Sequence, residues 1–535
     1  MKTRYEIAEE VVSNYKENKL LLKIGFDLID ISNGIDWRYK HTSNVRTYSV
    51  YLHTLDFLKS IVMVYEETKE EDLVILANKI LTSWYEYNEI RKDIDEFVWN
   101  EHAVSNRLHN ILYYFEKLGE LTADNQKYFD TIIEEHCDFL IDENNYRPNN
   151  HGIMMDKALI ESVSYIRNEK IKKLYLSKAL YRIKLAIFRD FSRRGVHLEN
   201  SPEYHRMVQK ILHITNQTLI KKNIKIGSEE HRLINLAKYF NRIMLKPNSS
   251  YPLIGDTGYI YDKYTKKTFE DFVDYDSGTV IFQQEHKDNL EESFYLFFKS
   301  GYKRKTHKHK DDLSFILTMD GSDIITDSGK YNYDKKDNLR DYFTSQNAHS
   351  TIIISNKDYS YGNPISDQFD LEIKNVKISD DLKVATGINN LYPNCKLKRT
   401  VIVTSDHLVI ILDEVLAEEK VDIIQNFILS EQLSVSKIDN KSYSMVDNKN
   451  TFVIQNLNKN FDDLESSVSE SKISYRFNEY DENLKISFTS SMINSNIVTC
   501  IYNENKGIKN VQYNNKNNIL TYEINSKIKE FNLFD

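Results

Sequence analysis

The sequence has few cysteines and no long apolar run. Its 535 residues include only three cysteines, Cys137, Cys395 and Cys500. They are far apart and odd in number, so neither a disulfide framework nor a C-x-x-C metal site is indicated, and we expect buried free thiols. No segment reaches the ~20 apolar residues that a membrane-spanning helix needs. The sequence therefore argues against a disulfide scaffold and against a helical membrane protein.

A signal peptide is also missing from the sequence as written. Residues 1–10, MKTRYEIAEE, lack the uninterrupted apolar core that such a peptide requires. The expectation is a cytoplasmic protein. A chain already trimmed at a cleavage site would look the same, and that chain would be periplasmic or secreted.

There is no excess of positive charge. The 71 Lys and Arg stand against 80 Asp and Glu, which gives a net charge of −9. Without a global field that attracts a polyanion, nucleic acid is a poor candidate partner, and an anionic ligand must be held by a local patch. Five basic residues and two histidines at 303–310 could form one; a solvated basic strand edge is the alternative.

Hydrophobic residues repeat at helical spacing up to about residue 245, as in Leu108, Ile111, Leu112 and Phe115. With 41% hydrophobic residues, the chain is long enough for two or three domains with substantial cores. Successive helices with short connections predict an (α/α) toroid or incomplete barrel over residues 1–250. One helix is expected at 169–192, and the next starts at Ser201-Pro202-Glu203.

The second half of the sequence has the pattern of strands. Residues 246–266 turn to Pro, Gly, Asn, Ser and Tyr, and residues 251–274 are predicted to join two domains. Short apolar runs bounded by turn residues then predict an antiparallel β-sandwich over 275–430. Residues 431–535 are a further β-sheet region, either a separate small lobe or the outer sheets of the same one. The expected fold class is therefore multidomain α + β.

Histidines and carboxylates gather in one window of this second half. The window contains T-H-K-H-K-D-D at 306–312, T-D-S-G at 326–329 and N-A-H-S-T at 347–351. Strands at 313–318 and 323–326 are predicted to pair around a turn, so that His307 and His309, two residues apart, share one face. Asp327 would lie near them. The alternative is that polar residues simply edge a sheet.

Together with motifs upstream, this window resembles the heparinase II/III-like family of polysaccharide lyases. The family's motifs occur here in the family's order across about residues 95–355. They are Trp99-Asn100-Glu101-His102-Ala103 with Arg107, then Asn150-His151-Gly152, then G-V-H-L-E-N-S-P-E-Y-H at 195–205, then His307-x-His309-x-Asp311, Asp327-x-Gly329 and Ala348-His349-x-Thr351.

The resemblance implies three catalytic residues and a toroid followed by a β-sandwich. A lyase must remove the proton beside a uronate carboxylate, so the carboxylate charge has to be offset; the resemblance gives that role to Asn150. It makes Tyr204 the catalytic tyrosine, which can serve as base and acid if nearby positive charge lowers its pKa. His307 is then a second base or a carboxylate partner. An Asn-Gly turn that caps a helix is the alternative for Asn150.

A divalent metal is a further expectation. His309, Asp327 and His349 offer two imidazoles and a carboxylate, which suit zinc or a similar ion. The resemblance implies that the metal is structural. A metal-free, hydrogen-bonded His–Asp–His network is the alternative. No organic cofactor is expected.

Other side chains are candidates for binding the sugar. Trp99 and His102 are predicted to share a helix face with Arg107 nearby, which suits an anionic sugar; in the alternative, Trp99 is core and Arg107 is solvated. The remaining predicted substrate-binding residues are His151, His205, Arg340 and Tyr342.

The leading function is a polysaccharide lyase that cleaves a uronate-containing glycan by β-elimination. The glycan would be glycosaminoglycan-like or a bacterial exopolysaccharide or capsular polysaccharide. A uronyl C5-epimerase of the same fold, which starts with the same proton abstraction, is the alternative. A non-catalytic glycan-binding or assembly protein is the third possibility, but such a protein would have no need of Asn150, Tyr204 and both histidines.

Overall fold

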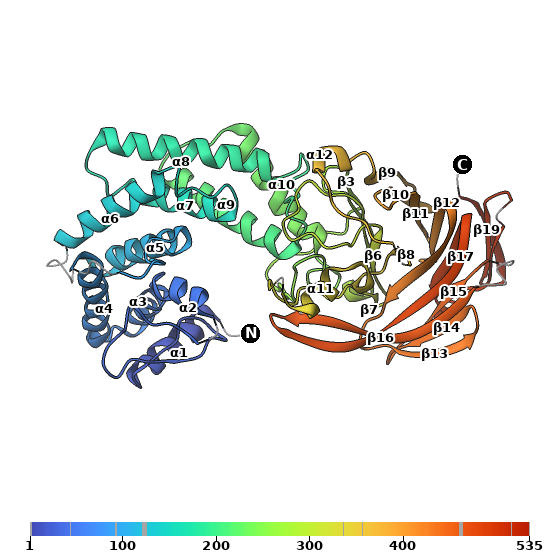
Figure 1. The fold of residues 1–535 in the computed structure, drawn as a ribbon, viewed down its shortest axis with the longest axis horizontal. Coiled ribbons are helices and arrows are strands. Elements are labelled where there is room, and N and C mark those ends of the chain that lie inside the picture. Colours follow the sequence, from blue (N-terminus) through green and yellow to red (C-terminus); the bar gives the residue numbers. More distant parts are fainter. Residues whose placement is uncertain are drawn as a thin grey trace. The chain divides into compact units, whose positions relative to one another are not determined.

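A computed structural model describes residues 3–42, 44–90, 94–119, 126–334, 336–355, 357–458, 464–514 and 516–533 (Figure 1). The chain divides into two compact units. We call Met1–Arg189 with Lys210–Arg232 the helical unit, and Asp190–Gln209 with Leu233–Asp535 the sheet unit. This division differs from the predicted domain 1–250, because two helical segments before residue 250 belong to the sheet unit.

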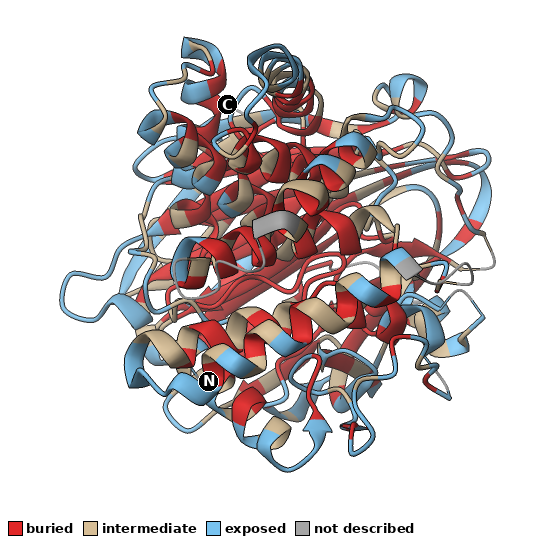
Figure 2. Ribbon diagram, turned by 90° about the vertical axis from the view of Figure 1, so that its left-hand side faces the viewer, coloured by how far each residue is buried: buried red, intermediate tan, exposed pale blue. Residues whose placement is uncertain are grey.

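The helical unit is built from amphipathic helices. In α5, for example, Leu108, Ile111, Leu112 and Phe115 are buried, as their spacing predicts. Buried and exposed residues lie on different sides of the helices in Figure 2. The helices are α1 (Arg4–Lys16), α2 (Val45–Leu52), α3 (Asp56–Thr68), α4 (Glu71–Ile90), α5 (Glu101–Leu118), α6 (Gln126–Ile141), α7 (Asn150–Ser162) and α8 (Glu169–Asp190); β1 (Lys19–Leu20) pairs with β2 (Ile29–Asp30).

Two further helices, α9 (Pro202–Lys221) and α10 (Ser228–Met244), have residues in both units. α8 matches the helix predicted at 169–192, and α9 begins at the predicted Ser-Pro-Glu start. The predicted helical N-terminal region is confirmed. Within the described ranges, no helix has the length and apolar character that crossing a membrane requires.

The sheet unit contains a five-stranded sheet and a ten-stranded sheet, both antiparallel. The first has the order β3 (Phe272–Asp274), β4 (Thr279–Gln284), β5 (Phe294–Lys299), β6 (Ser314–Met319), β7 (Ser322–Ile325). The second contains β8 (Ile352–Ile354), β9 (Leu371–Ile378), β10 (Leu382–Asn389), β11 (Cys395–Thr404), β12 (Val409–Ile428), β13 (Ser434–Asp439), β14 (Ser442–Val446), β15 (Thr451–Asn456), β16 (Glu465–Arg476) and β17 (Glu479–Asn503). Two short helices, α11 (Asn338–Thr344) and α12 (Pro364–Asp367), lie in connections.

Alternation along the strands creates separate cores on the two faces of each sheet. Phe294, Leu296 and Phe298 of β5 enter a core that both large sheets share. The intervening Tyr295 and Phe297 instead pack with the end of α10. This arrangement is the predicted antiparallel β-sandwich, with a helix end on the outer face of its smaller sheet.

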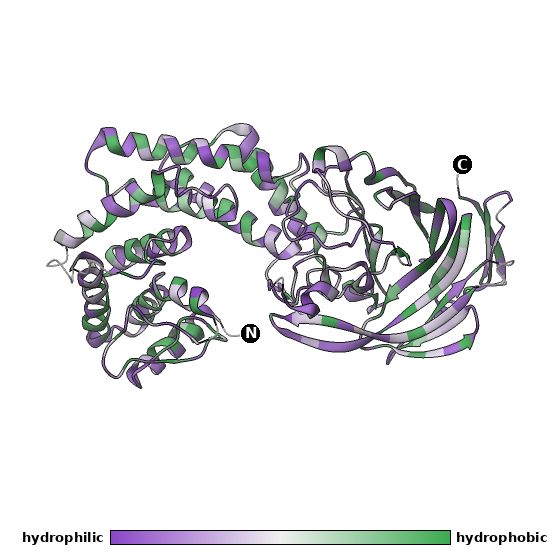
Figure 3. Cartoon of the chain, viewed as in Figure 1, coloured by the Kyte–Doolittle hydropathy of each residue, from purple (hydrophilic) through white to green (hydrophobic). Residues whose placement is uncertain are grey.

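The C-terminal strands extend the same sandwich. β13–β17 belong to the ten-stranded sheet, whose long strands mix hydrophilic and hydrophobic residues (Figure 3). A three-stranded sheet of β18 (Lys509–Asn514), β19 (Ile519–Ile524) and β20 (Lys527–Asn532) then shares a second core with β11, β12 and β17. Of the two possibilities for residues 431–535, the structure shows the outer sheets of one sandwich. All three cysteines are buried and free, as predicted.

Candidate active site

The first turn of α9 holds Tyr204 in the sheet unit. Pro202 is the first residue of this helix, a position where its missing N–H costs nothing. The preceding Ser201 Oγ accepts a hydrogen bond from the Tyr204 N–H at 3.4 Å and donates one to the Asp256 carbonyl at 2.9 Å. The start of α9 is therefore tied to the segment that carries Asp256.

Tyr204 and His307 stack on each other. Their ring centroids are 3.6 Å apart and their planes differ by 21°. The Tyr204 hydroxyl is 3.0 Å from the Tyr333 hydroxyl. Two residues predicted to be catalytic, 103 positions apart in the sequence, are thus brought into contact.

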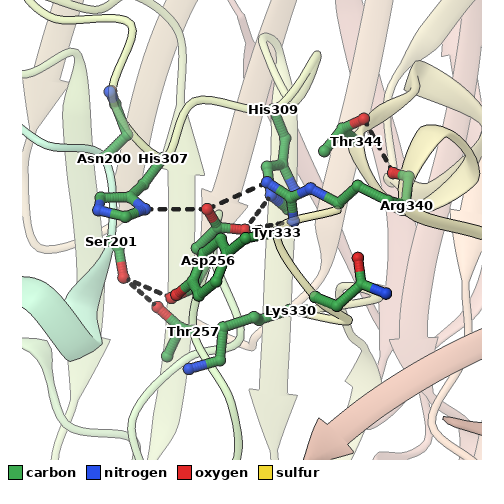
Figure 4. A network of polar contacts seen from close by, with 12 residues as sticks. Asn200, Ser201, Asp256, Thr257, His307, His309, Lys330, Tyr333, Arg340 and Thr344 are labelled. Carbon is green, nitrogen blue, oxygen red and sulfur yellow. Dashed lines mark hydrogen bonds and ion pairs between the residues drawn. The ribbon is translucent and has the colours of Figure 1, made fainter. Parts of the chain in front are cut away.

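Asp256 is the centre of this cluster (Figure 4). Its Oδ2 accepts from His307 Nδ1 at 2.9 Å, and its Oδ1 accepts from His309 Nε2 at 2.9 Å. Arg340 donates to both oxygens, at 2.5 and 3.1 Å. Burial opposes ionisation of this carboxyl, but the hydrogen bonds from His307, His309 and Arg340 outweigh it and hold the pKa of Asp256 well below its usual value.

The turn before Asp256 requires glycine. Gly255 has a φ of +53°, and a Cβ on it would lie 2.4 Å from the Asn200 carbonyl oxygen and 2.8 Å from the His307 carbonyl oxygen. No larger side chain fits between these two backbone segments. Gly255 therefore lets the Asp256 loop approach both motifs closely.

The segment that leads into the predicted strand does not have the extended backbone that would put His307 and His309 on one face. Residues 306–312 form turns and irregular structure, and His307 has a φ of +57°. His307 and His309 nevertheless converge, because each donates to a different oxygen of Asp256. The predicted strand pair itself is present as β6 and β7. A shared carboxylate, rather than strand alternation, brings the imidazoles together.

The condition under which Tyr204 could serve as both base and acid, a pKa lowered by nearby positive charge, is not met. Burial instead raises the pKa of Tyr204 to about 12. Glu203, Asp256 and Glu199 add negative charge around the phenol. Arg340, the nearby cation, is committed to Asp256. The phenol is therefore a neutral hydrogen-bond and proton donor at rest.

Three of the basic residues at 303–310 pair with carboxylates and are not available to form an anion patch. Lys308 is buried and pairs with Asp311 and, at 3.0 Å, with Asp312. Arg304 lies 2.5 Å from Asp190, and Lys310 pairs with Asp358. These three charges are neutralised by carboxylates of neighbouring segments, whereas Lys303 and Lys305 donate to the Gln368 side chain and the Tyr361 carbonyl. The alternative, a solvated basic edge, is equally wrong for Lys308.

The predicted metal ligands lie in one buried cluster. The rings of His309 and His349 are 5.5 Å apart, and His349 Nδ1 donates to Asp327 Oδ2 at 2.8 Å. His309 Nδ1 and His349 Nε2 are buried without a hydrogen-bond partner among the described residues. Each ring thus offers one bare nitrogen while its other nitrogen holds a carboxylate, the pattern of metal-ligating histidines. Asp327, however, faces His349 and the Gly329 N–H.

The fit to a metal is therefore good at two ligands and incomplete at the third. In the part of the chain that the structure describes, no group of three or more His, Cys, Asp or Glu side chains is arranged to hold an ion. The two bare nitrogens are the observation that favours a metal. The His349–Asp327 hydrogen bond instead favours the alternative, a metal-free hydrogen-bonded network.

A second polar cluster lies in the helical unit, at the start of α7. The Asn149 side chain caps the helix by accepting from the His151 N–H at 2.9 Å. The capping role that we considered for Asn150 thus belongs to its neighbour. The half-buried Asn150 amide has no hydrogen-bond partner among the described residues. It is free to bind a ligand.

His151 and His102 lie together beside Glu101. His151 Nδ1 donates to Glu101 Oε1 at 3.1 Å, and this bond holds the pKa of Glu101 below its usual value. The His102 ring is 5.3 Å from the His151 ring, and burial lowers the pKa of His102 to about 4. The cluster offers an amide and two imidazoles, which suit a carboxylate or sugar hydroxyl.

Two predicted substrate-binding residues are structural instead. Arg107 is fully buried; it donates to His136 Nε2 and to the His53 carbonyl, both at 2.8 Å, and stacks on aromatic rings that include Trp99. His205 is also buried, with Nε2 3.0 Å from the Ala237 carbonyl oxygen and Nδ1 accepting from a backbone N–H. Neither side chain is accessible to a sugar.

The remaining three residues predicted to bind substrate differ in their surroundings. Trp99 precedes α5 rather than lying within it, and it packs against the rings of His136 and Phe139. Arg340 holds Asp256, so it acts on the cluster through that carboxylate. The Tyr342 hydroxyl is 3.0 Å from the Ser471 hydroxyl of β16.

Comparison with known proteins identifies the family. The model of the heparinase II/III N-terminus matches residues 2–280, and that of the heparinase II/III-like C-terminal region matches residues 270–512. The chain belongs to the heparinase II/III family and is a polysaccharide lyase, a carbon–oxygen lyase. No curated protein sequence matches it.

Solved structures share the whole fold. Heparan sulfate lyase HepC from Pedobacter heparinus is 18% identical and superposes with a TM-score of 0.78, over 99% of this chain and 89% of that one. A heparinase III is 14% identical with a TM-score of 0.81, over 99% of this chain and 91% of that one. At these identities the likeness establishes the fold, a helical toroid followed by a β-sandwich.

Proposed function

We propose that this lyase cleaves a uronic-acid-containing glycosaminoglycan by β-elimination, with Asn150 neutralising the carboxylate and Tyr204 and His307 as acid and base. The stack of Tyr204 on His307, with His307 held by Asp256, is the observation that carries the proposal. It places a proton acceptor and a proton donor side by side.

His307 is suited to take the proton. Its Nδ1–H donates to Asp256, which fixes the tautomer and leaves Nε2 as the acceptor. Glu199 Oε2 lies 3.7 Å from Nε2, close enough to stabilise the imidazolium that forms. The electron pair of the broken C–H bond becomes the new C=C bond of the sugar.

Tyr204 is suited to give a proton to the leaving oxygen. Because burial raises its pKa to about 12, the phenol keeps its proton at neutral pH. As the C–O bond breaks, the oxygen takes the bonding electrons and accepts this proton, which balances the step. The phenolate left behind is reprotonated from solvent, and His307 loses its proton.

Asn150 is assigned the role of neutralising the uronate carboxylate of the substrate. Its side-chain amide can donate to the carboxylate oxygen where charge develops in the enolate, an effect typically worth ~3–4 kcal/mol per donor. The absence of a partner for this amide among the described residues supports the assignment. His151, the next residue of α7, and His102 of α5 lie together with their rings 5.3 Å apart.

The proposal includes a divalent ion, zinc or similar, at His309, Asp327 and His349. The bare nitrogens of both histidines support it. Such an ion would tie the segment that carries His307 and His309 to the segment around His349. It would have a structural role, and no step of the reaction passes through it.

Heparan sulfate is the first substrate to test, because the similar solved structures include a heparan sulfate lyase and heparinase III. The decisive variant is Tyr204→Phe, which keeps the stacked ring and removes the proton. We expect turnover, measured by the absorbance of the unsaturated uronate, to fall by ~10²-fold or more. Thermal unfolding should be unchanged. Tyr264→Phe, at an exposed tyrosine, is the control. Full activity in Tyr204→Phe would refute the assignment.

A further inference from the structure

A polar pocket lies in the helical unit, on the same two helices as the Asn150 cluster. It has a volume of about 240 Å³, and its lining includes Lys59, Ser105, Asn106, His109, Met154 and Lys157. On α7, Met154 and Lys157 follow Asn150 by four and seven residues, and on α5, Asn106 and His109 follow His102 by the same spacings. These spacings keep side chains on one helix face, so the pocket starts about one turn, ~6 Å, from Asn150 and His102.

Lys59 is the unmatched charge in this pocket. Its ammonium donates to His109 Nε2 at 3.1 Å and lies 5.5 Å from the Tyr113 ring centroid. No carboxylate among the described residues is within ion-pair distance of it. By contrast, Lys157 lies 2.7 Å from Glu161. Burial lowers the pKa of Lys59, and the nearby charge of Asp56 opposes this shift without reversing it, so the ammonium is partly desolvated and has no direct ion pair among the described residues.

The acidic groups of the pocket are already engaged. Glu161 accepts from His109 Nδ1 at 2.9 Å and pairs with Lys157. The Asp56 carboxylate accepts from the Asn110 amide at 2.7 Å, and burial raises the pKa of Asp56. With Glu161 neutralised by Lys157, the pocket retains Lys59 as a donor toward an incoming anion.

We propose that this pocket is a subsite for an acidic group of the glycan, a carboxylate or a sulfate, with Lys59 as its principal donor. The proposal rests on the proposed function in one respect, the assignment of Asn150 to the same substrate. The volume suits one sugar unit or its acidic group rather than a longer segment. Lys157 and the Asn106 amide complete the polar wall.

The test compares the full-length protein with Lys59→Gln. Inorganic sulfate and sodium glucuronate are added separately, against sodium chloride at the same ionic strength, and thermal unfolding is recorded. At least one of the two anions should raise the Tm of the wild type, and the shift should vanish in Lys59→Gln. The anion that raises the Tm identifies the acidic group that the pocket binds. Lys173→Gln, at an exposed lysine of α8, is the matched control and should behave as the wild type.

Kinetics give the second readout. On a polymer that the wild type cleaves, Lys59→Gln should raise KM about tenfold or more with kcat nearly unchanged, because it removes binding that is equal in ground and transition states. If Lys59→Gln fails to fold, Lys59→Met is used in its place, since it fills the same space without the charge.

Two results would overturn the subsite. One is an anion-dependent Tm shift that persists in Lys59→Gln; the other is the lack of any shift in the wild type. Failure of the proposed function is recognised separately. A wild type that cleaves no uronate polymer contradicts the lyase proposal, whereas the anion titrations still decide the pocket.

Discussion

At the scale of single residues, chemical context decides role more than residue type does. Arg107 and Arg340 both belong to segments predicted to bind sugar, yet one is a buried core residue and the other holds Asp256. Their positions in the sequence do not reveal this. A guanidinium that donates to His136 and to the His53 carbonyl cannot also reach a substrate.

This placement predicts that Arg107→Ala destabilises the protein rather than weakening substrate binding. Truncation leaves a cavity and an unpaired buried carbonyl, so we expect a loss of about 2–5 kcal/mol in the free energy of unfolding. Chemical denaturation measures it, with the exposed Arg46→Ala as control. Unchanged stability together with a raised KM would contradict the structural role.

The two bare imidazole nitrogens predict a bound metal. We expect elemental analysis of the purified protein to find about one zinc or similar ion per chain, and His349→Gln to lose it and to unfold at lower temperature. His286→Gln, at an exposed histidine of the sheet unit, should retain the metal. A metal-free wild type whose Tm is insensitive to chelators would show that His309, Asp327 and His349 form a hydrogen-bonded network.

At the scale of elements, the start of α7 explains the glycine of the Asn-His-Gly motif. A Cβ on Gly152 would lie 2.2 Å from the Arg147 carbonyl oxygen and 2.8 Å from the Tyr146 ring. The turn before the helix therefore packs directly on the helix backbone. This contact fixes where α7 begins and hence where Asn150 points.

Gly152→Ala should shift this helix start. We expect about 1–3 kcal/mol of destabilisation from overpacking, with a fall in lyase activity larger than the stability loss alone explains, because Asn150 moves. Denaturation and steady-state kinetics are measured together. Gly119→Ala is the control, since among the described residues a Cβ there would meet only Phe115, at 3.8 Å. Wild-type behaviour of Gly152→Ala would contradict the packing described here.

Sequence patterns predicted helices and strands better than they predicted loops. The start of α9 follows from Ser201-Pro202-Glu203, and the β6–β7 pair follows from its apolar runs and turn. The loop at 306–312 did not follow from its pattern, because His307 has a left-handed backbone conformation and its imidazole bonds to a carboxylate 51 positions earlier. Periodicity carries no information about such a long-range contact.

At the scale of the whole molecule, the order of motifs predicted the family and its two-part fold. It did not predict Asp256, the residue at the centre of the site. Asp256 lies in the Gly255-Asp256-Thr257-Gly258 segment, which reads as a connection between domains. The sequence signal that could have pointed to Asp256 is the pair of glycines that flank it in this segment. The importance of this carboxylate appears only when His307, His309 and Arg340 converge on it.

The division into compact units differs from the predicted domains for a physical reason. Helical periodicity continues to Met244, so the pattern predicts one helical domain up to that point. The fold instead assigns the start of α9, up to Gln209, and most of α10 to the sheet unit, where Phe240 and Ile243 share a core with Phe297. Tyr204 and His307 therefore belong to the same compact unit.

The central claim is β-elimination on a uronate glycan, and ultraviolet absorbance over time tests it most directly. Heparan sulfate, heparosan, chondroitin, dermatan, hyaluronan and alginate are supplied one at a time. We predict that absorbance from the conjugated unsaturated uronate rises with at least one polymer, heparan sulfate or heparosan first. No rise with any of them would contradict the account, and uptake of solvent deuterium into the sugar would then identify a C5-epimerase instead.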